Sequence, residues 1–328
     1  MPVSLITGAN GFAGSHMAEY LLGRDHRVIC LVRKTSDLSN LAGLDVEYRY
    51  GDINDRRSLP ETLRDVDYIF HFAGKTKATS EADYMKVNAE GTGNLAEACS
   101  LEGINTKMLV YCSSLSAVGP QQTDQPIDEK TPPRPLTAYG RSKLAGEQYL
   151  RRGCSNKVRW CILRPTGIYG PKDKDIYIYF KYISKGWKIL LSGAERKVSL
   201  IHAQDFAQLC YRAAMKSPHG EIYMASDGEA YTWDDISDII AKILGKKPYK
   251  ITVPLWITSI TAYFSEVFSA SSGESTPLNR EKLRELKAKG WVIDISKARN
   301  LLGFQPYYFL SDGLRETALW YRKKGWLK

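Results

Sequence analysis

A stretch near the start of the chain, "SLITGANGFAGSH" at residues 4–16, constrains the fold more than any other part of the sequence. The apolar run over 3–7 predicts a buried strand, and the apolar spacing over 14–22 predicts a helix. A glycine turn between a strand and a helix lets the backbone approach a pyrophosphate, which the N-terminus of the helix then binds. The stretch therefore predicts a dinucleotide site that includes Gly8, Asn10, Gly11, Phe12 and Gly14.

Strands and helices alternate along the first half of the chain. A long helical pattern covers 82–101, and strand patterns occur at 28–32, 46–50, 68–72, 107–114 and 158–165. This alternation predicts an α/β fold with a doubly wound parallel sheet, the Rossmann arrangement. We expect a cofactor-binding domain at 1–170, to which residues of about 195–225 return. A smaller, interleaved substrate-binding region is expected at 171–328.

Ligands of such sheets bind beyond the carboxyl ends of the strands, so the residues that follow each strand are candidate contacts. We expect Asp52 to reach the adenine amino group, with a helix cap or a turn as the competing interpretation of this residue. Ala73 and Gly74 would let the chain lie close to the nucleotide. The remaining strand ends supply Ile53, Ser113, Ser114 and Pro165.

Arg33 ends the second strand, 19 positions after Gly14. Many dinucleotide-binding proteins carry an acidic residue at this place, which binds the ribose 2′-hydroxyl. An acidic group repels a 2′-phosphate, whereas a guanidinium binds it through two hydrogen bonds. Arg33 therefore favours NADP(H) as the cofactor, with NAD(H) as the alternative. The competing interpretation is a solvated surface arginine.

Two segments carry the chemistry, "YCSSLSAVGP" and "TAYGRSKLAGE". Tyr139 and Lys143 are four residues apart at the start of a helix, so they share a face. A free tyrosine has a pKa near 10. A cation about 4 Å away contributes roughly 4 kcal/mol at an effective dielectric constant of about 20, which is about three pKa units. We therefore expect a pKa of Tyr139 near 7, suited to proton transfer, with a strand-end serine binding the substrate oxygen.

In combination these motifs resemble the extended short-chain dehydrogenase/reductase family, also called NAD-dependent epimerase/dehydratases. The resemblance covers nearly the whole chain and rests on "TGANGFAG", "GDIND", "VNAEGTGNL", "SS" before "VGP", "YGRSK", "LRPTGIYGP", "IHAQDFA" and "DISKARNLLGFQP". It is closest to the branch of dihydroflavonol reductase-like and beta-hydroxysteroid dehydrogenase-like enzymes. "LVRKTSDLSNLAGLDVEYRYGDI" and "WYRKKGWL" are typical of that branch.

The resemblance implies roles for individual residues. Ser114, which precedes Tyr139 by 25 residues, would be the catalytic serine. Ser113 would contact the cofactor mainly through its backbone, Lys143 would hold the nicotinamide ribose, and the Pro165 region would flank the nicotinamide ring. The family also suggests a homodimer.

The substrate expected from that branch is a ketone or secondary alcohol of an apolar or cyclic small molecule. Sugar-nucleotide relatives carry an asparagine where this chain has Gly167, and an arginine where it has Val198. Their second arginine, near "DISKA", is also missing, and only Arg196 and Lys289 could replace the pair from shifted positions. A nucleotide-sugar epimerase/dehydratase is the first alternative, and a non-catalytic NADP(H)-sensing regulator is the alternative of another class.

Composition narrows the remaining possibilities. The net charge of +10 comes from dispersed residues, which favours an anionic small molecule over nucleic acid. Six cysteines without paired spacing favour reduced thiols in the cytoplasm, and the histidines predict no metal site. No apolar run is long enough to span a bilayer. The stretch 253–268, "VPLWITSITAYFSEVF", predicts a buried helix over the substrate, with peripheral membrane contact as the alternative.

Overall fold

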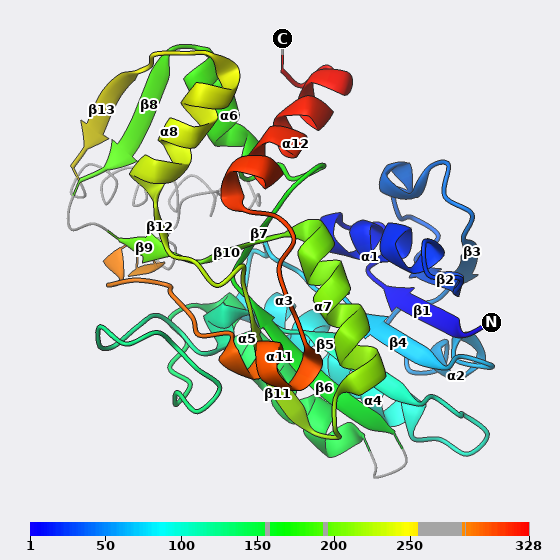
Figure 1. Cartoon of the computed structure of the whole chain (residues 1–328). Helices are drawn as coiled ribbons and strands as arrows, with labels where there is room; N and C mark the ends of the chain where they lie inside the picture. The colour runs from blue at the N-terminus through cyan, green and yellow to red at the C-terminus, as the bar shows by residue number, and fades with distance from the viewer. Residues whose placement is uncertain (155–157, 193–195, 255–283, 286, 328) are drawn as a thin grey trace.

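The computed structural model describes residues 1–154, 158–192, 196–254, 284–285 and 287–327 (Figure 1). Its central sheet has seven strands, all parallel, in the order β11-β6-β5-β4-β1-β2-β3. The strands are β1 (Val3–Thr7), β2 (Arg27–Val32), β3 (Glu47–Tyr50), β4 (Tyr68–His71), β5 (Met108–Cys112), β6 (Arg159–Pro165) and β11 (Glu221–Ala225). The predicted doubly wound parallel sheet is confirmed.

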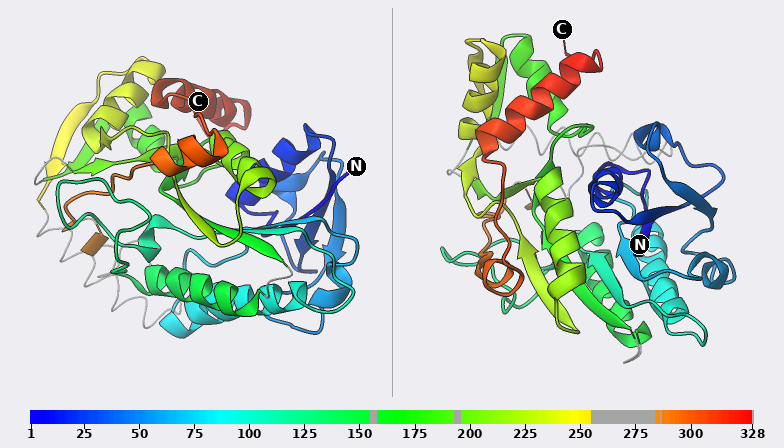
Figure 2. Two further views of the ribbon diagram at one scale, coloured as in Figure 1. Left: turned by 60° about the horizontal axis from the view of Figure 1, so that its bottom comes forward. Right: turned by 45° about the vertical axis from the view of Figure 1, so that its right-hand side comes forward.

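Helices cover both faces of this sheet (Figure 2). One face carries α1 (Phe12–Leu22), α7 (Ala203–Lys216) and α11 (Ser296–Leu302), and the other carries α4 (Gly91–Cys99) and α5 (Ala138–Gly153). The helix expected over 82–101 is three successive segments, because a π-helical turn, η2 (Met85–Glu90), separates α3 (Glu81–Tyr84) from α4. The short elements of this half are η1 (Ser39–Leu41), α2 (Leu59–Thr62) and η3 (Leu115–Ala117).

The direction of the winding reverses between β1 and β4. From β1 the chain builds β2 and β3 on one side, and it then crosses to β4, β5 and β6 on the other. The last strand, β11, is supplied by residues 221–225 and pairs with β6. Ligands of open parallel sheets bind at such a reversal, beyond the carboxyl ends of the strands.

In the second half of the chain, the described residues build a smaller body of three helices and three strand pairs. The helices are α6 (Tyr177–Ser184), α8 (Trp233–Leu244) and α12 (Leu310–Lys323). The pairs are β7 (Gly167–Tyr169) with β10 (Leu200–His202), β9 (Lys197–Val198) with β12 (Tyr231–Thr232), and β8 (Trp187–Leu191) with β13 (Tyr249–Val253). The three helices share a buried apolar cluster that includes Phe180, Ile236, Ile240, Leu314 and Tyr321.

Local sequence explains where α8 begins and ends. The Thr232 hydroxyl accepts a hydrogen bond from the Asp235 backbone N–H, and the Asp235 carboxylate accepts one from the Thr232 backbone N–H. This reciprocal pair satisfies two donors that a helix start otherwise leaves free. Gly245 ends the helix in the left-handed conformation, which costs glycine little.

The apolar stretch 253–268 lies outside the described residues except for Val253 and Pro254. Within the described ranges, no helix combines the length and the apolar composition that crossing a bilayer requires.

Candidate active site

The three predicted catalytic residues meet at the carboxyl end of β5. Ser114 follows that strand, while Tyr139 and Lys143 lie on the first turns of α5. The Thr137 hydroxyl caps this helix by accepting a hydrogen bond from the Gly140 N–H. The Ser114 hydroxyl accepts a hydrogen bond from the Ser116 N–H at 3.1 Å and also hydrogen-bonds with Tyr139. Two hydroxyls are therefore held side by side at the edge of the sheet.

The Lys143 ammonium is buried beneath these hydroxyls. Its Nζ donates to the Cys112 carbonyl oxygen at 2.6 Å and lies 4.4 Å from the centre of the Tyr111 ring. Burial raises the pKa of Tyr139 above its ordinary value, and the Lys143 charge lowers it by less. The expectation of a pKa near 7 is therefore wrong in direction. Because burial outweighs the ammonium charge, the phenol keeps its proton at neutral pH.

The glycine turn brings β1 against the end of β4. Gly8 has φ +69°, and a Cβ on it would lie 2.6 Å from the Ala73 backbone nitrogen. A Cβ on Gly14 would lie 2.3 Å from the Gly8 carbonyl oxygen. Both positions thus require glycine, the first also for its conformation. Gly11 precedes α1 and offers no side-chain cap, so the first N–H groups of the helix, from Phe12 onward, point to where a phosphate would bind.

Buried polar contacts fix the end of β4 at the reversal of the sheet. The Thr7 hydroxyl lies 2.6 Å from His71 Nδ1 and accepts a hydrogen bond from the Ala73 N–H at 3.2 Å. Burial lowers the pKa of His71 to about 3, so this imidazole is neutral and has a structural role. A Cβ on Gly74 would lie 3.9 Å from Lys143 Nζ, which places this glycine beside the predicted catalytic lysine.

Asp52 forms a turn, which was the competing interpretation of this residue. Its Oδ1 accepts hydrogen bonds from both the backbone N–H and the side-chain amide of Asn54, at 2.9 and 3.0 Å. Ile53 is buried, and its side chain occupies the space beside Gly91 that a Cβ would need. An adenine contact of Asp52 stays a prediction.

Arg33 stands exposed after β2, and the described residues include no ion-pair partner for its guanidinium. Hydrogen bonds join the loop that follows Arg33 to Asn10 in the glycine turn. The Asn10 side-chain amide donates to the Asp37 carbonyl at 3.2 Å, and the Asn40 amide donates to the Asn10 carbonyl at 3.0 Å. The loop that follows Arg33 is thereby fixed to the predicted phosphate-binding turn.

The side chain of Ser113 is hydrogen-bonded to a buried ion pair between Glu147 and Arg164. Its hydroxyl donates to Glu147 Oε1 at 2.6 Å, and its N–H donates to the Leu163 carbonyl at 2.8 Å. Arg164 binds both carboxylate oxygens of Glu147, at 2.9 and 2.6 Å. Glu147 lies four residues after Lys143 on α5, and Arg164 immediately precedes Pro165, the last residue of β6. The pair therefore locks α5 to the ends of β5 and β6.

Sequence reasoning assigned no role to two further residues near the site. Asn88, buried on the π-helical turn, exchanges hydrogen bonds with the backbone of Lys75 at 2.7 and 3.0 Å and donates to Ser142. Lys172, with φ +75°, donates to Glu19, Ser15 and the Asn40 carbonyl. The position of Asn88 within the motif "VNAEGTGNL" could have indicated its role. No local pattern in the sequence indicates the role of Lys172.

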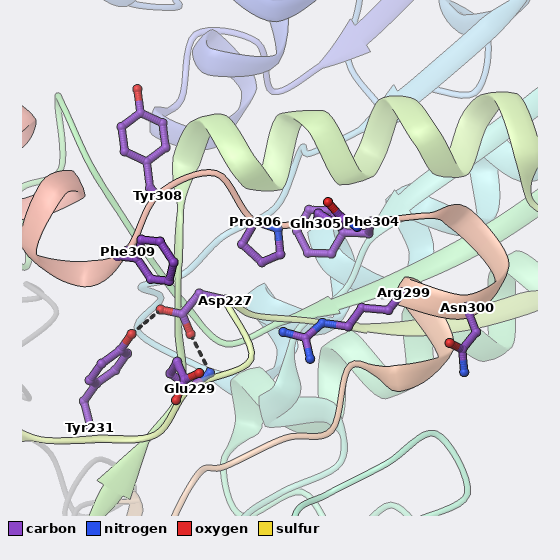
Figure 3. Close-up of a pocket in the computed structure, with 10 residues that line it drawn as sticks. All are labelled: Asp227, Glu229, Tyr231, Arg299, Asn300, Phe304, Gln305, Pro306, Tyr308 and Phe309. Carbon is purple, nitrogen blue, oxygen red and sulfur yellow. Dashed lines mark hydrogen bonds between the residues drawn. The ribbon is translucent and has the colours of Figure 1, made fainter.

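A separate hollow of about 510 Å³ lies beyond the end of β11 (Figure 3). Asp227 on its wall accepts hydrogen bonds from the Tyr231 hydroxyl and the Glu229 N–H. Burial raises the pKa of Asp227 to about 6. The lining residues include none of the predicted cofactor or catalytic residues, so the hollow is distinct from the candidate active site.

A Rossmann sheet with a glycine turn at its reversal and a Ser–Tyr–Lys group at a strand end defines a dinucleotide-dependent oxidoreductase. The NAD dependent epimerase/dehydratase family model matches residues 4–226. The chain belongs to this family, and it is an NAD(P)-dependent oxidoreductase of the extended short-chain dehydrogenase/reductase type. The resemblance inferred from the motifs is confirmed.

Individual relatives align over almost their whole length. A ceramide reductase from Caulobacter vibrioides is 28% identical over 99% of this chain and 96% of its own. A 3 beta-hydroxysteroid dehydrogenase/Delta 5-->4-isomerase from vaccinia virus is 31% identical, over 98% of this chain and 99% of its own. The crystal structure of Thermus thermophilus UDP-glucose 4-epimerase in complex with NAD superposes with a TM-score of 0.77 at 25% identity, over 98% of this chain and 99% of that one.

Proposed function

We propose that this protein is an NADP(H)-preferring oxidoreductase that interconverts a ketone and a secondary alcohol on an apolar or cyclic small molecule. The convergence of Ser114, Tyr139 and Lys143 at the end of β5 carries the proposal. Cofactor binding is assigned to residues 1–170 with the returning segment of about 195–225, and substrate binding to 171–328. Six free thiols support a cytoplasmic location, and the family analogy suggests a homodimer.

The site residues divide the chemistry among them. The nicotinamide, when bound, supplies or accepts the hydride at the substrate carbon. In the direction of reduction Tyr139 donates its proton to the substrate oxygen, and the Ser114 hydroxyl hydrogen-bonds that oxygen. The Lys143 charge stabilises the phenolate that remains. The raised pKa of Tyr139 supports this role, since an acid catalyst must hold its proton before the reaction.

Two positions that could bind a sugar-nucleotide diphosphate argue against that ligand. Val198 packs on the apolar cluster of the smaller body, while Lys197 beside it is exposed. Lys289 pairs with Asp124 at 2.7 Å. Relatives named for ceramide and for a 3 beta-hydroxysteroid support an apolar substrate in place of the diphosphate. The nucleotide-sugar alternative is supported by the fold that this chain shares with UDP-glucose 4-epimerase.

Titration with UDP and with UDP-glucose separates these two substrate classes. For the protein loaded with NADPH, we expect dissociation constants weaker than about 1 mM, because bidentate arginines are absent from the expected positions. Isothermal calorimetry measures both, and titration of NADPH into the same preparation confirms that the protein is intact. Micromolar binding of either nucleotide would identify a nucleotide-sugar enzyme.

The exposed guanidinium of Arg33 predicts the choice of cofactor. Arg33→Ala should weaken NADPH binding by about 2 kcal/mol, the range for a charge-assisted hydrogen bond, and should leave NADH binding nearly unchanged. Arg27→Ala, which removes an exposed arginine from the other end of β2, is the matched control and should alter neither affinity. Equal affinities of the unaltered protein for the two cofactors would contradict the preference.

A non-catalytic regulator would bind the cofactor and turn over nothing. A panel of ketones and alcohols, followed by NADPH absorbance, tests this alternative directly. Turnover of any member supports the enzyme, and we expect it among apolar cyclic or long-chain ketones.

A further inference from the structure

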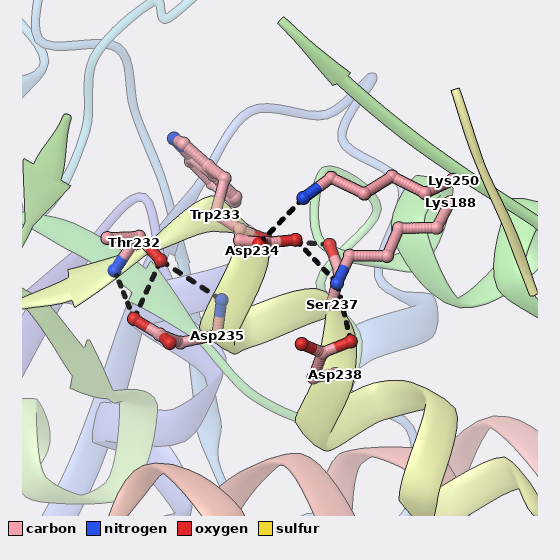
Figure 4. Close-up of polar contacts among 8 residues, drawn as sticks. All are labelled: Lys188, Thr232, Trp233, Asp234, Asp235, Ser237, Asp238 and Lys250. Carbon is pink, nitrogen blue, oxygen red and sulfur yellow. Dashed lines mark hydrogen bonds and ion pairs between the residues drawn. The ribbon is translucent and has the colours of Figure 1, made fainter. Parts of the chain in front are cut away.

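Among the elements that the structure describes, helices cover one face of the strand pair β8–β13, and the side chains of the other face, the open face, are exposed. Lys188 and Lys250 point to the covered face, where α8 packs (Figure 4). Lys188 Nζ lies 2.5 Å from carboxylate oxygens of Asp234 and Asp238, and Lys250 Nζ lies 2.9 Å from Asp234. Because side chains alternate along a strand, the neighbouring positions of both strands face the opposite way.

The open face is apolar and strongly exposed. Trp187 is paired in register with Tyr249, and Ile189 with Ile251. The exposed fractions of these four residues are 45%, 77%, 39% and 40%, respectively. The rings of Trp187 and Tyr249 lie 6.3 Å apart. Four large apolar side chains that share one open face form a contiguous patch, which marks an interaction site more often than scattered residues do. We call these four residues the β8–β13 patch.

Unpaired cations border one end of the β8–β13 patch. The two strands are parallel, so they start at the same edge. Lys185 precedes Trp187 by two residues, while Lys246 and Lys247 precede Tyr249. All three lysines are exposed, and none forms an ion pair with a residue that the structure describes. Neither strand contains an acidic residue.

We propose that the β8–β13 patch docks onto the surface of an anionic lipid bilayer. Tryptophan and tyrosine side chains favour the interface between lipid and water, and isoleucine inserts below them. Lysines beside such residues are attracted to anionic headgroups. An anionic bilayer fits the patch better than a second copy of the chain does, because a second copy carries the same positive net charge and so offers no complementary charge. The net charge of +10 acts in the same direction as the local cluster.

Flotation with vesicles tests the proposal on the full-length protein. The vesicles are pure phosphatidylcholine, or phosphatidylcholine with about one third phosphatidylglycerol. We expect binding to the anionic vesicles, weak or no binding to the neutral ones, and release at high salt, since screening weakens attraction to the headgroups. The readout is the bound fraction and not turnover, so a failure of this proposal is distinct from a failure of the proposed activity.

Two variants divide the apolar and the charged contributions. Tyr249→Ser with Ile251→Ser should lower vesicle affinity at least fivefold, because two exposed apolar side chains no longer insert. Lys246→Gln with Lys247→Gln should lower it about twenty-five-fold, since each lysine near an anionic surface contributes about fivefold. Tyr307→Ser, which removes a tyrosine that is also 77% exposed, is the matched control and should bind as the unaltered protein does.

Circular dichroism confirms that each variant is folded before flotation. The proposal is overturned if the unaltered protein does not bind anionic vesicles. It is equally overturned if both double variants bind like the Tyr307→Ser control. A third result against it is a dimer that dissociates in the Tyr249→Ser, Ile251→Ser variant, because the β8–β13 patch would then be an interface between copies.

Discussion

Tyr139→Phe should reduce turnover of the ketone substrate at least a hundredfold, the loss expected when an acid–base group is removed. The ring of residue 139 would remain next to Tyr84, whose ring centre lies 6.0 Å away, so the local packing is retained. NADPH affinity, measured by calorimetry, should stay within about twofold. Tyr149→Phe removes a hydroxyl from the same helix away from the site, and it should leave turnover unchanged.

The pH dependence provides a second check on Tyr139. Because burial raises the pKa of this residue above its usual value near 10, the phenol stays protonated across the neutral range. The rate of reduction should therefore be flat from about pH 6 to about pH 9, and it should fall only at higher pH as the proton is lost. Substantial activity of Tyr139→Phe, or a fall in the reduction rate near pH 7, would remove Tyr139 from the role of proton donor.

Arg164→Met should lower the free energy of unfolding by about 3–5 kcal/mol, because it leaves the Glu147 carboxylate buried without its cation. Ser113 would still donate one hydrogen bond to this carboxylate, which is too little to offset the desolvation of a charge. Urea denaturation followed by circular dichroism measures the change. Arg159→Met, at the exposed first position of the same strand, should cost less than about 0.5 kcal/mol.

Removing both charges separates the contribution of the ion pair to the free energy of unfolding from the contribution of side-chain packing. The double variant Glu147→Leu, Arg164→Met should recover most of the stability lost in the single variant, since no unpaired charge stays buried. A loss below about 1 kcal/mol in Arg164→Met would show that solvent reaches the pair. Arg164→Met should also lower turnover. The Ser113 hydroxyl donates a hydrogen bond to Glu147, and Ser113 directly precedes Ser114.

The spacing of residues close together in the chain was sufficient to predict much of the sheet. The strand over residues 3–7 coincides with β1, and the glycine turn after it needs glycine at Gly8 and Gly14. These features depend on residues close together in the chain, so their spacing is visible without the fold. The same holds for Tyr139 and Lys143, which share a helix face because they are four residues apart.

Contacts between distant segments decided the rest. Ser113 could be identified as a strand-end residue, but only the pairing of β5 with β6 places Arg164 and Glu147 around its hydroxyl. Asn88 lies in the π-helical turn that interrupts the helix expected over 82–101. Its amide bonds to Lys75, and that partner lies 13 positions earlier in the chain.

By itself, the sequence determined the alternation of strands and helices that builds the parallel sheet, and the glycine turn after β1, because each follows from local periodicity or from glycine sterics. Only the tertiary structure decided the direction of the pKa shift at Tyr139. Local spacing gives the distance to Lys143 but does not reveal how deeply both groups are buried, nor that the Cys112 carbonyl and the Tyr111 ring bind the ammonium. Desolvation depends on every segment that covers a group, and those segments are far apart in the chain.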